Sequence, residues 1–343
     1  MELPEQPDVS RNELMAVQLE EAGRLLLRGT ASHARLAFIL LDNAAELLMA
    51  RKIEHSLMLN SVYERTLRRW DEILQHTDDA EARTRRDEVK VAIIPKAKVK
   101  ELHRLFDSKV DFLVEKDHID VVEGRVLKKL HRYRNELYHR DRIRAVTVRS
   151  VSLLYFELAC ALFERGDHWP LGEAINRTSP ELDRFSSSSK QVGMPTAGMI
   201  VSRVRADLNL DSAGLKEVLL MHLGSRLDEL EGDIVSVVEL FPSLSELLSR
   251  FPEVPPGICS EPVIRLAQVY ESVPLEALPQ RAHAELRYGA SDLERWRQAI
   301  EDMRRHDDVL ELFTAFADLE DDFEPLEVQL RGLLARLDQE LHG

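Results

Sequence analysis

The chain has 343 residues, a formal net charge of −15, 44% hydrophobic residues and 31% charged residues. This length predicts one large or two ordinary domains, and the hydrophobic content is sufficient for a folded core. The acidic N-terminus contains no apolar segment of the secretory type, and the apolar run 36–41 is too short to span a bilayer. These features favour a cytoplasmic protein that does not enter the membrane.

The two cysteines, Cys160 and Cys259, are too few for a disulfide framework and lack the CxxC spacing of a zinc site. We therefore expect reduced, buried thiols, as is usual in the cytoplasm. No metal and no other cofactor is expected from the sequence.

Charge is unevenly distributed along the chain. Residues 1–180 contain 30 basic and 30 acidic side chains, whereas residues 181–343 contain 16 and 31. The stretch 178–198 contains two prolines and four consecutive serines, which is typical of a linker. We expect a helical domain at 1–177, a linker at 178–198 and an acidic helical domain at 199–343, with different partners for the two domains.

Helix signals cover both halves of the chain, and no segment alternates with period two for long enough to be a strand. Capping boxes at 10–13 and 61–64 open two of the helices. The first domain is expected to contain helices at about 10–29, 32–55, 61–76, 80–94, 96–116, 119–138 and 143–165. In the second, a capping box at 291–294 opens one helix, and 324–341 is amphipathic. The fold class predicted is all-α, with an N-terminal helical bundle followed by a second, smaller helical domain.

Positive charge is concentrated in residues 132–144, RYRNELYHRDRIR, where five arginines surround one histidine. Within this stretch Arg134 and His139 are separated by four residues. Arg28 and His33 have the same spacing, and Arg132 precedes His139 with six intervening residues. The Arg134-Asn135 start, and its place at the end of one helix before an apolar helix, favour Arg134 and His139 over the other matches.

This segment resembles the Arg-x(4–6)-His signature of the HEPN superfamily, over roughly residues 10–169; nothing similar is found in the C-terminal half. The resemblance implies an HEPN-like helical bundle that forms a homodimer with facing motifs. It also implies a metal-independent endoribonuclease that cleaves RNA by 2′-hydroxyl attack and leaves a 2′,3′-cyclic phosphate. Family members include bacterial toxins and antiviral defence effectors, often restrained by an antitoxin or another regulatory protein.

The chemistry of the residues fits this reaction. His139 is suited to act as the base for the 2′-hydroxyl, and Arg134 to hold the phosphate and stabilise the developing charge. Asn135 lies four residues before His139 and could orient its imidazole, whereas Tyr138 could stack on a base or simply pack. On a straight helix Arg134 and His139 are about 140° apart. Either the helix breaks near 136–139, or two subunits each contribute to one site.

A second polar feature lies in the apolar helix around 36–49. Arg35, Asp42 and Glu46 form a stripe on a helix that should otherwise be buried, and buried carboxylates are costly unless they are paired. Arg134 is an expected partner of Asp42 or Glu46, which would make both carboxylates supports of the site. A purely structural salt-bridge network accounts for them equally well.

Between residues 124 and 149 there are nine basic side chains against two acidic ones. Such an excess is suited to RNA phosphates, and binding should weaken with salt. The residues expected to bind RNA are Arg132, Arg140, Arg142 and Arg144. A solvated charged face is the alternative interpretation.

Two other interpretations remain open. The motif could be a basic helix end whose histidine is incidental, because cations favour helix C-termini. The domain could also be a catalytically silent HEPN-like module for dimerisation or protein interaction. The other histidines, including His131, lack ligand spacing and are interpreted as structural.

Overall fold

The computed structural model describes residues 11–77, 79–139, 147–166, 182, 184–185, 195–210, 214–240, 260–270 and 287–342. Within these residues every regular element is a helix and there is no strand, so the all-α prediction is confirmed. None of the helices in these ranges has the length and apolar character that crossing a bilayer requires. The chain divides into two compact units, Met1–Ser212 and Ala213–Gly343, which we describe separately.

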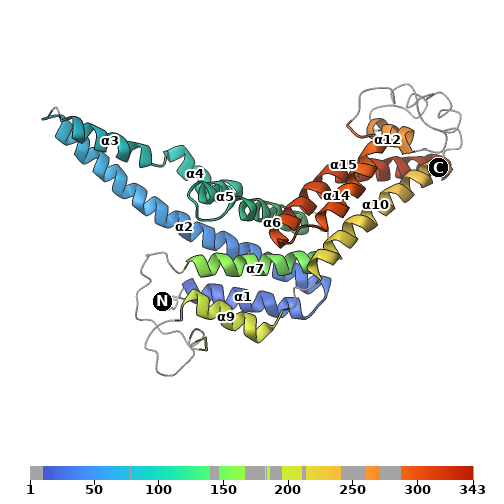
Figure 1. Cartoon of the computed structure of the whole chain (residues 1–343), viewed down its shortest axis with the longest axis horizontal. Helices are drawn as coiled ribbons and strands as arrows, with labels where there is room; N and C mark the ends of the chain where they lie inside the picture. Colours follow the sequence, from blue (N-terminus) through green and yellow to red (C-terminus); the bar gives the residue numbers. More distant parts are fainter. Residues whose placement is uncertain are drawn as a thin grey trace, which may run out of the picture. The chain divides into compact units, whose positions relative to one another are not determined.

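The first unit contains the helices of the N-terminal bundle. These are α1 (Arg11–Leu27), α2 (Ala31–Leu74), α3 (Ala80–Ala92), α4 (Lys96–Arg104), α5 (Phe106–Glu115), α6 (Val121–His139), α7 (Val148–Gly166) and α9 (Ala197–Leu208). The first half of α2 packs against α1 and α7, and α5 and α6 pack against α2 as well (Figure 1). This places the first half of α2 at the centre of the unit.

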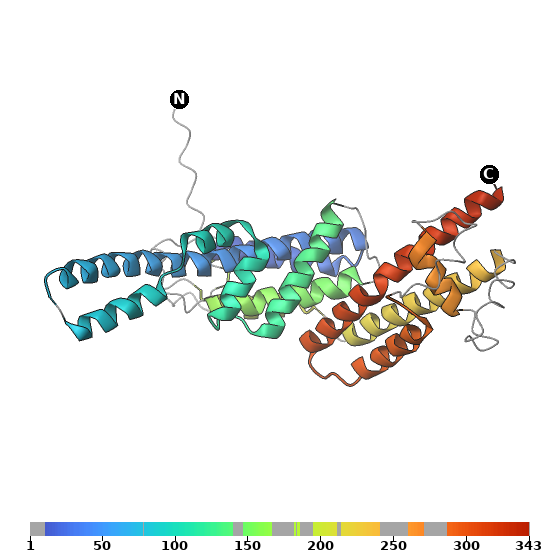
Figure 2. The ribbon, with the colours of Figure 1, turned by 90° about the horizontal axis from the view of Figure 1, so that it is seen from above.

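Helix α2 is a single helix of 44 residues, where the sequence predicted two. The Ser61 capping box does not start a helix, because the Ser61 hydroxyl donates to the Met58 carbonyl within α2. The buried positions of α2 are concentrated between Ala34 and Ile53, and beyond Ile53 only Asn60 is buried in this helix. The second half of α2 pairs with α3, as the view from above shows (Figure 2).

The single helix predicted at 96–116 is two helices, α4 and α5. Leu105 between them is extended (φ −110°, ψ 122°) and about half exposed. The break changes the chain direction directly before Phe106, whose ring stacks on His131 of α6. The neighbours of α4 and α5, rather than local helix propensity, therefore decide where the helix is interrupted.

Helices α6 and α7 match their predicted positions to within a few residues where the structure describes them. Along α6 the buried apolar positions include Val126, Leu130, Tyr133 and Leu137, as the helical period predicts. Burial on α7 extends almost all round the helix, since both apolar and small polar residues between Val148 and Phe163 are buried.

Helix α9 packs against α1 and α7 and belongs to the first unit, whereas the sequence placed it in the second domain. Close approach is possible because Gly23 of α1 has no side chain: a Cβ there would lie 2.1 Å from Leu208 Cδ1. Arg205 of α9 also contacts Glu157 and Glu164 of α7, at 2.8 and 3.2 Å. The composition of the stretch 178–198 indicated a linker, but it could not reveal this packing.

The second unit contains α10 (Leu215–Leu240), α12 (Ser260–Val269), α14 (Ala290–Met303) and α15 (Val309–His342). Helices α10 and α15 pack along each other, and α12 and α14 pack against both. Helix α15 continues through Pro325, whereas the sequence predicted a helix only from 324. A proline inside a helix removes one hydrogen bond, so the packing of α15 compensates for the loss.

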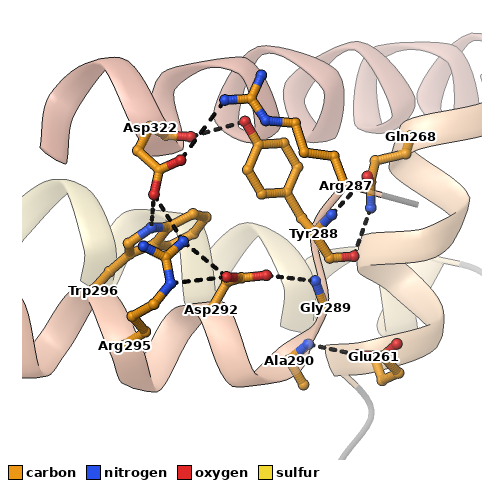
Figure 3. A network of polar contacts seen from close by, with 10 residues as sticks. All are labelled: Glu261, Gln268, Arg287, Tyr288, Gly289, Ala290, Asp292, Arg295, Trp296 and Asp322. Carbon is orange, nitrogen blue, oxygen red and sulfur yellow. Dashed lines mark hydrogen bonds and ion pairs between the residues drawn. The ribbon is translucent and has the colours of Figure 1, made fainter. Parts of the chain in front are cut away.

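A polar network fixes the start of α14 (Figure 3). The helix is capped at Gly289, and the Asp292 carboxylate accepts from the Gly289 amide at 2.8 Å. The capping box predicted at 291–294 is thus displaced by two residues. Asp322 of α15 accepts from the Trp296 indole at 2.8 Å and pairs with Arg295 at 2.8 Å. These contacts join α14 to α15 through buried and half-buried polar groups.

Candidate functional site

The first unit contains a buried polar cluster around Asp42, which is 1% exposed in the middle of α2. The Tyr155 hydroxyl on α7 donates to Asp42 Oδ1 at 2.9 Å. His131 Nδ1 on α6 lies 3.0 Å from Oδ1 and 3.2 Å from Oδ2. Arg134 Nε, also on α6, lies 3.4 Å from Oδ2. One buried carboxylate therefore accepts a hydrogen bond from Tyr155, contacts His131 Nδ1, and pairs with Arg134 through an ion pair rather than a hydrogen bond. This satisfies the requirement that a buried charge be paired.

Arg134 is the motif arginine, and its contact with Asp42 is one of the two that the sequence predicted. Its Nη1 group donates to the side-chain oxygen of Asn135 at 3.0 Å, so a second residue of the motif also orients the guanidinium. The side chain of Arg134 keeps 30% of its surface exposed. The guanidinium is thus paired with a buried carboxylate, while part of the Arg134 side chain stays exposed.

His131 is held in the same cluster from two sides. Its ring stacks on Phe106 with centroids 3.8 Å apart and an angle of 3° between the planes. Because an ionised carboxylate can only accept hydrogen bonds, Asp42 requires the proton of His131 on Nδ1. The side chain is 18% exposed. His131 is therefore a fixed imidazole with a known orientation, next to the motif.

Tyr155 completes the cluster as a neutral donor. Burial, and then the charge of Asp42, raise the pKa of Tyr155 well above its usual value. The hydroxyl consequently stays protonated and donates to Asp42 throughout the physiological range.

Helix α6 remains helical through His139, its last residue. Arg35 of α2 donates to the Leu137 carbonyl in the last turn, which satisfies an acceptor that the helix itself leaves open. An unbroken helix keeps the positions of Arg134 and His139 about 140° apart. Of the two arrangements that the sequence left open, the break at 136–139 is not observed. The side chains of Tyr138 and His139 lie outside the described part of the structure.

The remaining predicted residues have different positions. Glu46 does not contact Arg134 but pairs with Lys109 of α5, whose side chain is 8% exposed. The reason is position: Glu46 lies one turn further along α2 than Asp42, beside α5 rather than beside the end of α6. Arg132 is exposed on α6. Arg140, Arg142 and Arg144 lie outside the described residues.

A second Arg-x4-His pair makes direct contact. Arg28 Nη1 lies 3.3 Å from His33 Nε2, and Thr30 Oγ1 lies 2.7 Å from His33 Nδ1. Thr30 is the N-cap of α2, and Gly29 precedes it with a φ of 72°. The Arg28–His33 pair lies at the exposed corner between α1 and α2. There His33 contacts the N-cap residue Thr30, so the pair supports the capped start of α2.

Three members of the cluster were not identified from the sequence: His131, Tyr155 and Phe106. His131 was interpreted as structural, although it precedes Arg134 by three residues and so shares its helix face. That spacing was a usable signal. Tyr155 and Phe106 gave none, because an aromatic residue in an apolar helix is the ordinary pattern of a core.

Among the described residues, no group of three or more histidine, cysteine, aspartate or glutamate side chains is arranged to hold a metal ion. No protein-family model, no curated protein and no solved structure matches this chain. Its function must therefore be argued from the cluster itself.

Proposed function

We propose that the first unit is a metal-independent endoribonuclease of the HEPN type. In this proposal Arg134 binds the scissile phosphate, and His139 removes the proton of the 2′-hydroxyl. The 2′-oxygen attacks phosphorus, the 5′-oxygen leaves, and the products carry a 2′,3′-cyclic phosphate and a 5′-hydroxyl. Such a reaction is restricted to RNA, because DNA lacks the nucleophile.

The observation that supports the proposal most is the anchoring of Arg134 by a buried carboxylate. An arginine that serves only solubility needs no buried partner, whereas a phosphate clamp gains from a guanidinium held in one orientation. Asp42 and Asn135 provide this restraint, and 30% of the arginine side chain remains accessible to a ligand. Arg132 adds exposed positive charge on the same helix.

The continuous helix favours a homodimeric site. Since Arg134 and His139 diverge by about 140° on one helix, a single phosphate is reached more easily by Arg134 of one subunit and His139 of another. We therefore include dimerisation through the first unit in the proposal. The cellular role that fits is a cytoplasmic toxin or antiviral defence effector, with an antitoxin or regulatory protein as partner.

The first experiment is RNA cleavage in EDTA by the purified chain and by Arg134→Ala and His139→Ala. Loss of the base should lower the rate by about 10²–10⁴-fold, and loss of the phosphate clamp by about 10²–10³-fold. Arg125→Ala and His103→Ala are matched controls, since both residues are exposed in the same unit. Full activity in both motif variants would refute the assignment of the site.

A mixing experiment tests the composite site. Arg134→Ala and His139→Ala are each inactive as homodimers in the proposal, but a mixed dimer contains one intact site. Random mixing should restore on the order of a quarter of the wild-type activity. If both residues act within one subunit, mixing restores nothing.

The silent-module alternative makes an opposite prediction in cells. Expression of the enzyme should arrest bacterial growth, and His139→Ala should relieve the arrest. A dimerisation or protein-interaction module would be indifferent to that substitution, and its purified form would not cleave RNA in any preparation.

A further inference from the structure

The proposed reaction requires two proton transfers, and the motif supplies one histidine. The base takes the proton of the 2′-hydroxyl, but the 5′-oxygen must gain a proton as its bond to phosphorus breaks. The proposed site therefore lacks an identified group that donates this second proton to the 5′-oxygen. Among the described residues, His131 has an imidazole that contacts the same carboxylate as Arg134.

The position of His131 relative to Arg134 suits this task. The two residues are three apart on α6, so they lie about 60° apart around the helix and about 4.5 Å apart along it. Both contact the same buried carboxylate, His131 at Oδ1 and Arg134 at Oδ2 of Asp42. A phosphate held by Arg134 is consequently next to the ring of His131, on the same face of α6.

The restraints on His131 leave one functional edge of the ring. Asp42 occupies Nδ1, and Phe106 covers one face of the ring at 3.8 Å. The side chain keeps 18% of its surface exposed, and Nε2 is the ring nitrogen that Asp42 does not engage. A histidine whose Nδ1 proton is fixed by a carboxylate, with Nε2 turned to the ligand, is the usual arrangement for directed proton transfer.

We infer that His131 is a catalytic residue that donates a proton from Nε2 to the leaving 5′-oxygen, with Asp42 as its positioning residue. This inference rests on the proposed function. The balance is complete: His139 gains the 2′-hydroxyl proton, the O2′–P bond forms, the P–O5′ bond breaks, and His131 supplies the proton that the 5′-oxygen takes up. Exchange with water then resets both imidazoles, and no oxidant, metal or further reactant takes part.

The substitution that isolates this role is His131→Asn. The asparagine amide nitrogen occupies the place of Nδ1 and can still donate to Asp42, but nothing replaces Nε2. His103→Asn, at an exposed position of α4, is the matched control. Tyr155→Phe removes a different donor from Asp42 and reports on disturbance of the cluster alone.

The test compares two RNA substrates with one cleavable linkage, one with the natural 5′-oxygen and one with a bridging 5′-sulfur. A thiolate leaves without a proton, so the sulfur substrate needs the base but not the acid. We expect His131→Asn to lose about 10²–10⁴-fold on the oxygen substrate and to cleave the sulfur substrate at nearly the wild-type rate. His139→Ala should be slow on both.

Every other outcome overturns the inference, and the outcomes are distinguishable. Equal losses of His131→Asn on both substrates, matched by Tyr155→Phe, would make His131 a structural residue while the ribonuclease assignment stands. If His131→Asn cleaves both substrates at the wild-type rate, His131 is likewise not a catalytic residue, and the ribonuclease assignment stands. A wild-type chain that cleaves neither substrate would refute the proposed function and the inference together.

Discussion

Each unit of the chain buries charge in a helical core, and the two do so differently. In the second unit Arg226 lies between Glu320 and Glu327, which are 0% and 5% exposed, and its guanidinium lies 4.7 Å from the Phe323 ring. In the first unit Asp42 holds His131, Arg134 and Tyr155, and two of these three keep an accessible part. The cluster around Arg226 in the second unit is the more closed one, with Arg226 14% exposed, whereas the cluster around Asp42 in the first unit leaves 18% of His131 and 30% of Arg134 exposed. Buried charge therefore occurs in both units, and the two clusters differ in how much of the paired groups stays exposed.

The largest effect is expected from opening the closed cluster. Arg226→Ala leaves two buried carboxylates without their guanidinium, which should lower the unfolding free energy of the second unit by about 3–5 kcal/mol. Denaturant unfolding followed by the fluorescence of Trp296 measures this. Arg305→Ala is the control, because that side chain is 79% exposed, its partner Asp302 is 50% exposed, and its loss should cost less than about 1 kcal/mol. Equal effects of the two substitutions would contradict the distinction between closed and exposed ion pairs.

A smaller but functional effect is expected from Asp42→Asn. The amide keeps one acceptor oxygen but loses the charge that holds Arg134 and His131, so the unfolding free energy of the first unit should fall by about 2–3 kcal/mol. In the proposed ribonuclease RNA cleavage should fall as well, because Arg134 loses its charged partner. Asp111→Asn is the control, at a 61% exposed partner of Lys128. Unchanged cleavage with reduced stability would separate Asp42 from the site.

Tyr155→Phe tests the least accessible member of the same cluster. It removes one hydrogen bond to a buried carboxylate and leaves the shape of the core almost unchanged, so we expect a loss of about 1–2 kcal/mol. Thermal or denaturant unfolding is the measurement, with Tyr63→Phe at an exposed position of α2 as the control. A loss above that of Asp42→Asn would mean that Tyr155, rather than the carboxylate, organises the cluster.

The smallest effect concerns the response of the two units to mild acid. Burial, and next the charge of Lys52, lower the pKa of His118 in the first unit below its usual value of 6.5. Since the unfolded chain then binds more protons than the folded one, the first unit loses stability as the pH falls below 6.5. His118→Gln should flatten the dependence of the melting temperature on pH between about 7.5 and 5.5. A slope unchanged from wild type would show that other groups dominate this window.

In the second unit the corresponding window is lower. Burial acts to raise the pKa of Asp322, but hydrogen bonds from Trp296 and Arg295 outweigh it, and the pKa lies below its usual value of 3.8. The stability that Asp322 contributes is complete above pH 3.8. It is lost as the pH falls through the lower pKa that Asp322 has in the folded state. At pH values between 6.5 and 3.8, acid therefore reduces the stability contributed by His118 but not that contributed by Asp322.

The helical class of the fold could be predicted because each amphipathic period is a local property, as the buried face of α6 shows. What failed were boundaries that depend on neighbours. The Ser61 box is a valid local signal, but α3 pairs with α2 beyond it and the helix continues. The local sequence around Leu105 does not predict a break in the helix. The break follows from the stacking of Phe106 on His131.

For the site, the sequence supplied the contact between Arg134 and Asp42 because buried charge demands a partner, an argument that needs no coordinates. It could not choose between Asp42 and Glu46, which are four residues apart on one helix face. In the structure Glu46 pairs with Lys109 of α5, which leaves Asp42 as the partner of Arg134. His131 was missed because each histidine was judged by ligand spacing, rather than by its spacing from the arginine of the motif.

The length of α2 has a practical consequence. Beyond Asn60 none of its residues is buried, and α3 buries only Ala82, so this two-helix arm has almost no core of its own. Its amides should exchange with deuterium at a rate set by separation of α2 from α3, and long before those around Asp42. A short peptide inserted after Thr77 should therefore leave the rest of the first unit intact. The arm offers a place for a fluorescent or affinity handle about 20 Å beyond the last buried residue of α2.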